Sequence, residues 1–180
     1  YTLFKNFEGF PDTALTVSFW MKSSDMSHDG SLFSFASPGH DNECLIYNNQ
    51  NFQIFLGTEN TGGTGVSAND GQWHHIAGVY TGSEIRLYVD GRVDEKGSAG
   101  PVNTSSDLVY IGSRVNRTYD RNWKGNIDEV RIYDTGLSEA NILYLSESDP
   151  LILINNPRST DLVLDGVINL DDLQEFMKMW

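Results

Sequence analysis

Asp128 lies where the strand pattern would bury a carboxylate. In the run from Ile127 to Tyr133, Val130 and Ile132 share its parity, so a regular strand would turn all three side chains toward the core. A bare carboxylate is costly to bury. We therefore expect Asp128 to be hydrogen-bonded, bound to an ion or displaced by a β-bulge, and a hydrogen-bonded structural role is favoured over direct metal ligation.

The adjacent residues Asp128 and Glu129 do not fit the pattern of a catalytic carboxylate pair. Retaining glycosidases hold two carboxyl groups about 5 Å apart. Asp128 and Glu129 are adjacent, so in a regular strand they would point to opposite faces. His74 and His75 diverge for the same reason and have no Glu-x-x-His helix beside them, which argues against zinc. We expect no catalytic residues.

Two polar segments, residues 37–42 and 114–123, interrupt the strand pattern and are expected to be exposed loops. Loops on a rigid scaffold are where binding residues gather. Tyr119 and Trp123 are candidates for stacking on sugar rings. Ordinary packing is the alternative for both, and it is equally favoured for Trp123, which directly precedes a core strand.

The elements that would position these residues are short strands. Runs rich in Val, Ile, Phe, Tyr and Trp alternate with turn residues, which predicts an all-β fold. Asp90-Gly91 predicts a type I′ hairpin turn, and the alternation before it predicts a half-buried strand with Tyr88 on the polar face. The expected strands are residues 1–7, 15–22, 30–37, 43–47, 52–57, 73–80, 84–89, 92–95, 107–113 and 125–133.

A short helix is expected after the last strand. Ser138 can cap it, and Ile142, Leu143 and Leu145 form an apolar stripe. Residues 147–160 contain two prolines and are predicted to be a linker.

Charge and composition exclude several classes of partner. The chain has 12 Lys and Arg against 25 Asp and Glu, a formal charge of −13, which would repel nucleic acid and anionic membranes. No apolar run approaches the roughly 20 residues of a membrane helix, so no membrane insertion is expected. Cys44 is the only cysteine, so an internal disulfide is impossible.

Three segments resemble the laminin-G-like and pentraxin-like branch of the concanavalin A-like lectin/glucanase superfamily. They are LTVSFWMK at residues 15–22, GQWHHIA leading to LYVDG over residues 71–91, and GNIDEVRIYD with Leu-Ser over residues 125–138. The resemblance covers roughly residues 1–146 and implies a jelly-roll sandwich of two antiparallel sheets. It also implies glycan binding, adhesion or partner recognition, with calcium often held in edge loops.

The resemblance to pentraxins suggests a calcium site. Asp41 and Asn42 match the Asp-Asn pair that binds calcium in that family. In the second pentraxin loop, Arg114 replaces an acid, so Asn116 and Asp120 are the donors that remain. Calcium wants six to eight oxygens, so a solvated polar loop stays open as the alternative.

Residues 161–180 resemble one EF-hand type repeat of a dockerin, the small appendage of the expected fold. Val163 stands where a side-chain oxygen is expected, which weakens the site, and a metal-free helix cap is the alternative. The expected calcium ligands are the side chains of Asp161, Asp165, Asn169 and Asp172 and the backbone carbonyl of Val167.

These patterns predict a non-catalytic carbohydrate-binding or adhesion module of a larger secreted or cell-surface protein. Its expected partner is a polysaccharide or glycan and its expected cofactor is calcium. One alternative is a protein-binding or assembly module whose dockerin-like tail engages a cohesin-like protein. A glycoside hydrolase is the least favoured alternative.

Overall fold

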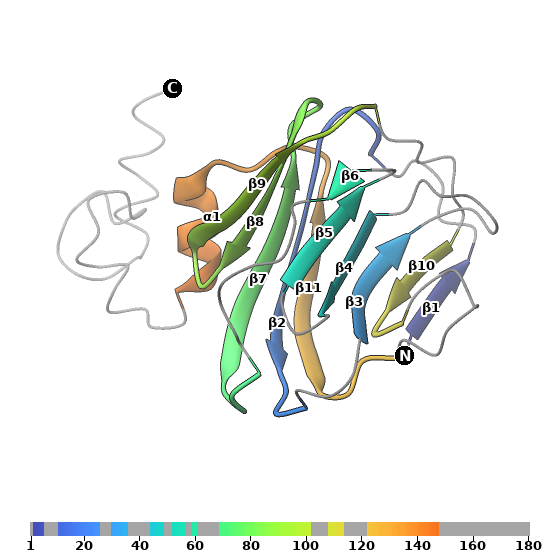
Figure 1. The fold of residues 1–180 in the computed structure, drawn as a ribbon, viewed down its shortest axis with the longest axis vertical. Helices are drawn as coiled ribbons and strands as arrows, with labels where there is room; N and C mark the ends of the chain where they lie inside the picture. The colour runs from blue at the N-terminus through green and yellow to red at the C-terminus, as the bar shows by residue number, and fades with distance from the viewer. Residues whose placement is uncertain are drawn as a thin grey trace, which may run out of the picture.

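The computed structural model describes residues 2–5, 11–25, 30–35, 44–48, 52–56, 59–60, 69–101, 108–113 and 122–147. These residues form two antiparallel β-sheets packed face to face and one short helix (Figure 1). The predicted all-β sandwich of two antiparallel sheets is confirmed.

Each sheet combines strands that are distant in sequence. The strand predicted at residues 92–95 extends to Ser98, and the short strand at Glu59–Asn60 was not expected. One sheet has the order β1 (Thr2–Lys5), β10 (Leu108–Ile111), β3 (Gly30–Phe35), β4 (Cys44–Asn48), β5 (Phe52–Leu56), β6 (Glu59–Asn60). The other has the order β11 (Asn126–Tyr133), β2 (Leu15–Lys22), β7 (Trp73–Tyr80), β8 (Glu84–Val89), β9 (Arg92–Ser98).

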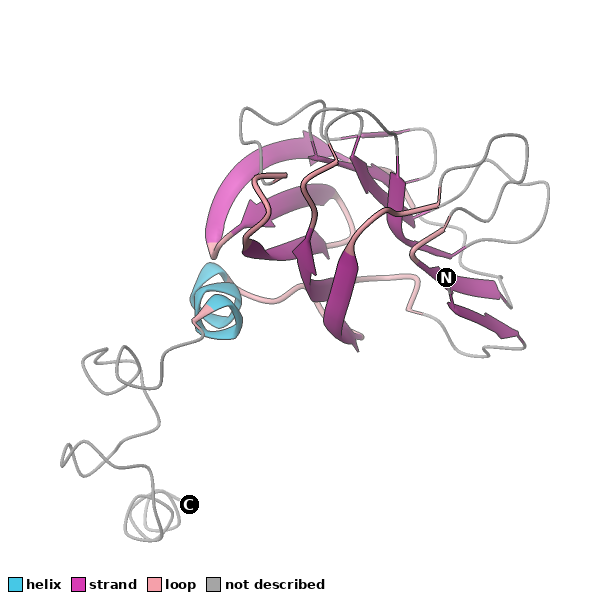
Figure 2. Cartoon of the chain, turned by 90° about the horizontal axis from the view of Figure 1, so that it is seen from below, coloured by secondary structure: helices cyan, strands magenta, loops and turns pink. Residues whose placement is uncertain are grey.

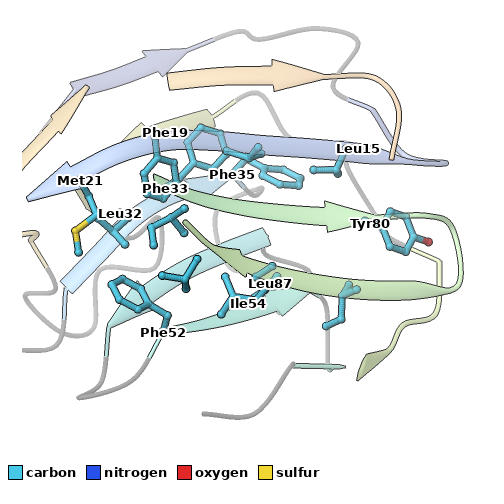
Figure 3. Close-up of a cluster of buried hydrophobic side chains, with 14 of the residues drawn as sticks. Leu15, Phe19, Met21, Leu32, Phe33, Phe35, Phe52, Ile54, Tyr80 and Leu87 are labelled. Atoms are coloured by element: carbon cyan, nitrogen blue, oxygen red, sulfur yellow. The ribbon is translucent and has the colours of Figure 1, made fainter. Parts of the chain in front are cut away.

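The main core lies between the sheets. Alternate residues of β2 point inward, so Val17, Phe19 and Met21 are fully buried. They belong to one cluster with Phe33 and Phe35 of β3, whose rings lie 6.3 Å apart (Figure 3). Because inward-facing residues of both sheets interdigitate, the sandwich is rigid enough to hold side chains on its outer faces in fixed positions.

Helix α1 (Glu139–Ser146) packs on the outer face of the five-stranded sheet (Figure 2). Ser138 caps it as predicted, because its hydroxyl accepts a hydrogen bond from the backbone N–H of Asn141 at 3.3 Å. Ile142 is fully buried against Ala77 and Tyr88. Tyr88 thus lies on the face opposite Ile85, Leu87 and Val89, as predicted, but it is buried there because the helix covers it.

The hairpin between β8 and β9 is confirmed as a type I′ turn. Asp90 has a φ of 49° and Gly91 a φ of 75°, the pair of positive values that this turn requires. The turn lies next to the start of β7, because the backbone N–H of Asp90 donates to the carbonyl of His75 at 2.8 Å.

Candidate functional site

An open groove of about 690 Å³ lies on the outer face of the five-stranded sheet, beside the C-terminal end of α1. Aromatic and charged side chains come together in it from three strands and the helix. The residues lining the groove are Trp20, Gln72, Trp73, Asp128, Glu129, Arg131, Tyr144, Leu145 and Glu147. An aromatic cleft with a few polar groups is the usual form of a ligand site.

Strand alternation and register place the two tryptophans. Trp20 follows the inward-facing Phe19, so it faces away from the core. Antiparallel pairing sets Trp20 opposite His75 and Lys22 opposite Trp73, so the two indoles are diagonal neighbours on one face. Trp73 is 43% exposed, which leaves much of its surface free for a ligand.

Tyr144 faces the groove from α1 and is 45% exposed. Its position depends on how the chain leaves β11. The hydroxyl of the buried Thr16 donates to the carbonyl of Thr135 at 2.8 Å and accepts from the backbone N–H of Leu137 at 2.9 Å. These two hydrogen bonds tie the start of the helix to β2, and they fix where Tyr144 stands.

A β-bulge in β11 turns two consecutive carboxylates outward. The pairing of β11 with β2 shifts between Asp128 and Arg131, and Glu129 has a φ of 49°. Asp128 and Glu129 are both exposed and both line the groove, while Val130 packs against the core. The expectation that Asp128 and Glu129 point to opposite faces was therefore wrong, because the bulge breaks the alternation.

Displacement by a bulge, one of the three outcomes expected for Asp128, is what the structure shows. Its Oδ1 also accepts a hydrogen bond from the backbone N–H of Glu129 at 2.8 Å. Positive φ at a residue with a side chain costs about 1–3 kcal/mol, and such strain gathers at functional sites. The bulge is thus a second reason, besides the exposed aromatics, to place a binding site here.

Negative charge dominates the groove. Three of its lining residues are carboxylates, and one is a cation, Arg131. The Nη2 of Arg131 lies 2.6 Å from Oε2 of Glu129, so its charge is already paired. Oε2 of Glu147 is buried and has no hydrogen-bond partner within the described part of the chain.

His74 stabilises the segment that contains Trp73 through hydrogen bonds to two carboxylates. Its Nδ1 lies 2.7 Å from Oδ2 of Asp90, and its Nε2 lies 3.1 Å from Oδ1 of Asp70. Partial burial lowers the pKa of His74, but the hydrogen bonds to the two carboxylates outweigh it, so the pKa lies above its ordinary value. Asp70 also accepts from the backbone N–H of Gln72 at 2.7 Å, which fixes the groove wall.

His75 lies directly opposite Trp20 on the neighbouring strand, on the same outer face of the sheet, and is fully buried. The two rings meet edge to face, with centroids 5.5 Å apart. Neither ring nitrogen has a hydrogen-bond partner among the residues that the structure describes. Burial lowers the pKa of His75 to about 4, so the ring is neutral at pH 7.

Most of the predicted site residues lie outside the residues that the structure describes. Within the described ranges, no group of three or more His, Cys, Asp or Glu could hold a metal. Trp123 is partly buried and packs against the core, which agrees with its packing alternative. The candidates that lie outside the described residues are Asp41, Asn42, Asn116, Tyr119, Asp120, Asp161, Asp165, Val167, Asn169 and Asp172.

The calcium sites, the dockerin-like repeat and its cohesin-like partner therefore stay predictions.

Sequence reasoning missed the aromatic groove residues Trp20, Trp73 and Tyr144. The sequence did contain a signal for Trp20. It follows the inward-facing Phe19, so it lies on the outer face, where a large aromatic needs either a packing partner or a ligand.

The fold and the groove together define a lectin-type β-sandwich with an open aromatic site on one sheet. The family model described as the concanavalin A-like lectin/glucanases superfamily matches residues 1–143. The chain belongs to this family, and the predicted concanavalin A-like jelly roll is confirmed.

A relative in Rattus norvegicus is the Sushi, von Willebrand factor type A, EGF and pentraxin domain-containing protein 1. It is 29% identical over 148 residues, which are 76% of this chain and 4% of that protein. This chain thus spans a small part of the relative's length. The pentraxin-like character predicted from the sequence is supported by this match.

Two solved structures share the fold. Domain 4 of AbnA, an extracellular arabinanase from Geobacillus stearothermophilus in complex with arabinotriose, has a TM-score of 0.63 and 21% identity, covering 76% of this chain and 68% of that chain. The CBM40 of the Ruminococcus gnavus IT-sialidase, bound to α2,3 sialyllactose, has a TM-score of 0.61 and 13% identity, covering 76% of this chain and 84% of that chain.

In the described residues, no helix has the length and apolar character to cross a membrane.

Proposed function

We propose that this chain is a non-catalytic carbohydrate-binding module of a larger secreted or cell-surface protein, and that it binds a glycan in the groove. The observation that carries the proposal is the pair of exposed aromatics, Trp73 and Tyr144, in an open cleft that also holds several hydrogen-bonding side chains.

The chemistry of the groove suits a sugar. The apolar C–H face of a pyranose or furanose ring can stack on an indole or phenol ring, and burying that area is favourable. Asp128, Gln72 and Glu147 offer acceptors for sugar hydroxyls at the edges of such a stack. Fold relatives crystallised with arabinotriose and sialyllactose support the same class of ligand.

The first test is the replacement Trp73→Ala. Aromatic residues at the centre of a site contribute about 2 kcal/mol or more, so we expect the affinity for the bound glycan to fall at least about 30-fold. The ligand would be found on an array of neutral and acidic glycans, and its affinity measured by titration calorimetry.

Tyr133→Ala is the matched control, because it removes an aromatic of β11 that does not line the groove. Its affinity should stay within about twofold, with circular dichroism verifying the fold of both variants. Equal affinity of Trp73→Ala and wild type would refute the site. Release of shorter sugars from any glycan on the array would refute the non-catalytic role.

We also propose that calcium binds the loops that contain Asp41, Asn42, Asn116 and Asp120. Their oxygen donors match the preference of this ion. A buried hydrogen bond joins the described residues next to these two segments: the hydroxyl of Ser34, near the end of β3, donates to the carbonyl of Ser113 at 3.0 Å. Ser113 directly precedes the second loop segment, and β3 leads into the first.

Calcium at 100 times its Kd is expected to stabilise the folded chain by about 2.7 kcal/mol, which raises the Tm by roughly 5–10 °C. Asp41→Asn should abolish most of this shift, and Asp12→Asn, an exposed control, should not. Thermal melts with calcium and with a chelator measure it. A shift that persists in Asp41→Asn but vanishes in Asp161→Asn would assign the ion to the tail instead.

A further inference from the structure

We propose that the groove accepts uncharged glycans and rejects glycans that carry carboxylate or sulfate groups, and that the bulge at Asp128 and Glu129 is the filter. This inference rests on the proposed function, since it names the class of sugar that the same groove takes. Three observations support it: the sign of the groove's charge, the pairing of its cation, and the backbone that presents the acids.

The cation that lines the groove among the residues described is paired with a carboxylate. Arg131 is the single basic side chain that lines it, and its Nη2 lies 2.6 Å from Oε2 of Glu129. This contact uses one of the five N–H groups of the guanidinium, and the pair that it forms with Glu129 carries no net charge. A sialic or uronic acid that approached Arg131 would therefore also meet the carboxylate of Glu129.

The remaining charges repel an anion. Asp128 and Glu147 line the groove together with the paired Glu129 and Arg131, which leaves two carboxylates in excess. A ligand carboxylate a few ångströms from them would meet like charge in a half-exposed site, and we expect this to weaken binding by at least about tenfold. Sugar hydroxyls instead donate hydrogen bonds to the same oxygens.

The bulge is what brings the acids into the groove. In an unbroken strand, only one of two consecutive side chains could face the outer surface. The register shift and the positive φ of Glu129 turn both outward, and the backbone N–H of Glu129 holds the Asp128 carboxylate at 2.8 Å. The backbone departs from regular geometry at the place where it doubles the negative charge facing a ligand.

The test compares lactose with α2,3-sialyllactose and α1,4-galactotriose with trigalacturonic acid, together with the tightest neutral glycan from the array. We expect the wild-type chain to bind the neutral glycans and not the acidic ones. Glu129→Gln removes one negative charge and releases Arg131, so acidic glycans should bind at least about tenfold more tightly than to wild type. Their neutral counterparts should lose less than about fivefold.

Asp134→Asn is the matched control, because it makes the same change of charge at an exposed residue that follows β11 and does not line the groove. It should leave both affinities within about twofold. Asp128→Asn, which leaves the Arg131 pair intact, should give a smaller gain for acidic glycans and serves if Glu129→Gln fails to fold.

Two results overturn the proposal in distinguishable ways. If wild type binds acidic glycans as tightly as neutral ones in the groove, with Trp73→Ala reducing both, the filter is wrong and the proposed function stands. If no glycan of either kind binds, the proposed function fails and the filter fails with it.

Discussion

Lowering the pH from 7 to 4.5 is expected to cost the wild-type chain on the order of 3 kcal/mol of unfolding free energy through His75 alone. The cause is the pKa of His75, which burial lowers to about 4, whereas an unfolded histidine titrates near 6.5. Between these two values the unfolded chain binds a proton that the folded chain does not. Stability is therefore full above about pH 6.5 and is lost as the pH falls through the folded pKa.

His74 does not confuse this measurement, although it is the next residue. Its pKa is raised, so its contribution to stability is fully present below the unfolded pKa and is lost only as the pH rises through the folded value. The carboxylates with lowered pKa, such as Asp70, begin to lose their contribution only near or below pH 4. Among the described groups with a shifted pKa, His75 therefore has the largest destabilising change between pH 6.5 and 4.5.

The replacement His75→Leu tests the expectation. Leucine has nearly the volume of histidine, and it removes two buried nitrogens that have no hydrogen-bond partner within the described residues. We expect the variant to unfold at nearly the same urea concentration at pH 7 and pH 4.5. His74→Asn is the matched control, and it should keep the acid sensitivity of wild type. An equal loss of stability in His75→Leu and wild type would assign that sensitivity elsewhere.

His75 also connects stability to the groove, because its ring meets that of Trp20 edge to face. A proton on His75 would place a charge next to Trp20, which lines the groove. The affinity of a neutral glycan should therefore decline over the same pH range in wild type and hold steady in His75→Leu.

Much of the fold could be predicted because its signals are local. The alternation in β2 follows from Val17, Phe19 and Met21, the type I′ turn follows from Asp90-Gly91, and the start of α1 follows from Ser138. Each of these features depends on neighbouring residues, and the structure contains all three.

The groove could not be predicted in the same way, because it depends on pairings between distant segments. The bulge exists only in the pairing of β11 with β2, and a strict period of two assigns Asp128 to the core. The burial of Tyr88 likewise depends on where α1 returns to the sheet. Trp20 and Tyr144 face one cleft only after the turn at Thr135 is tied to Thr16.

Replacing Gly125 with alanine is expected to destabilise the fold by about 3 kcal/mol and to lower the Tm by roughly 6–12 °C. Gly125 directly precedes β11, where the chain passes close to the end of β2. A Cβ at this position would collide with the backbone carbonyl oxygen of Lys22, and it would lie 2.9 Å from Nε1 of Trp123. The contact with Lys22 involves backbone, so it cannot be relieved by turning a side chain.

Gly100→Ala is the matched control, because a Cβ there would meet nothing within 4 Å. Its free energy of unfolding should stay within about 0.5 kcal/mol of wild type. Since Gly125 sets how closely β11 approaches β2, Gly125→Ala should also shift Asp128 and Glu129 relative to Trp20 and weaken glycan binding. Thermal melts and calorimetry on both variants measure the two effects. Equal melting temperatures for Gly125→Ala and Gly100→Ala would contradict the close approach on which the groove depends.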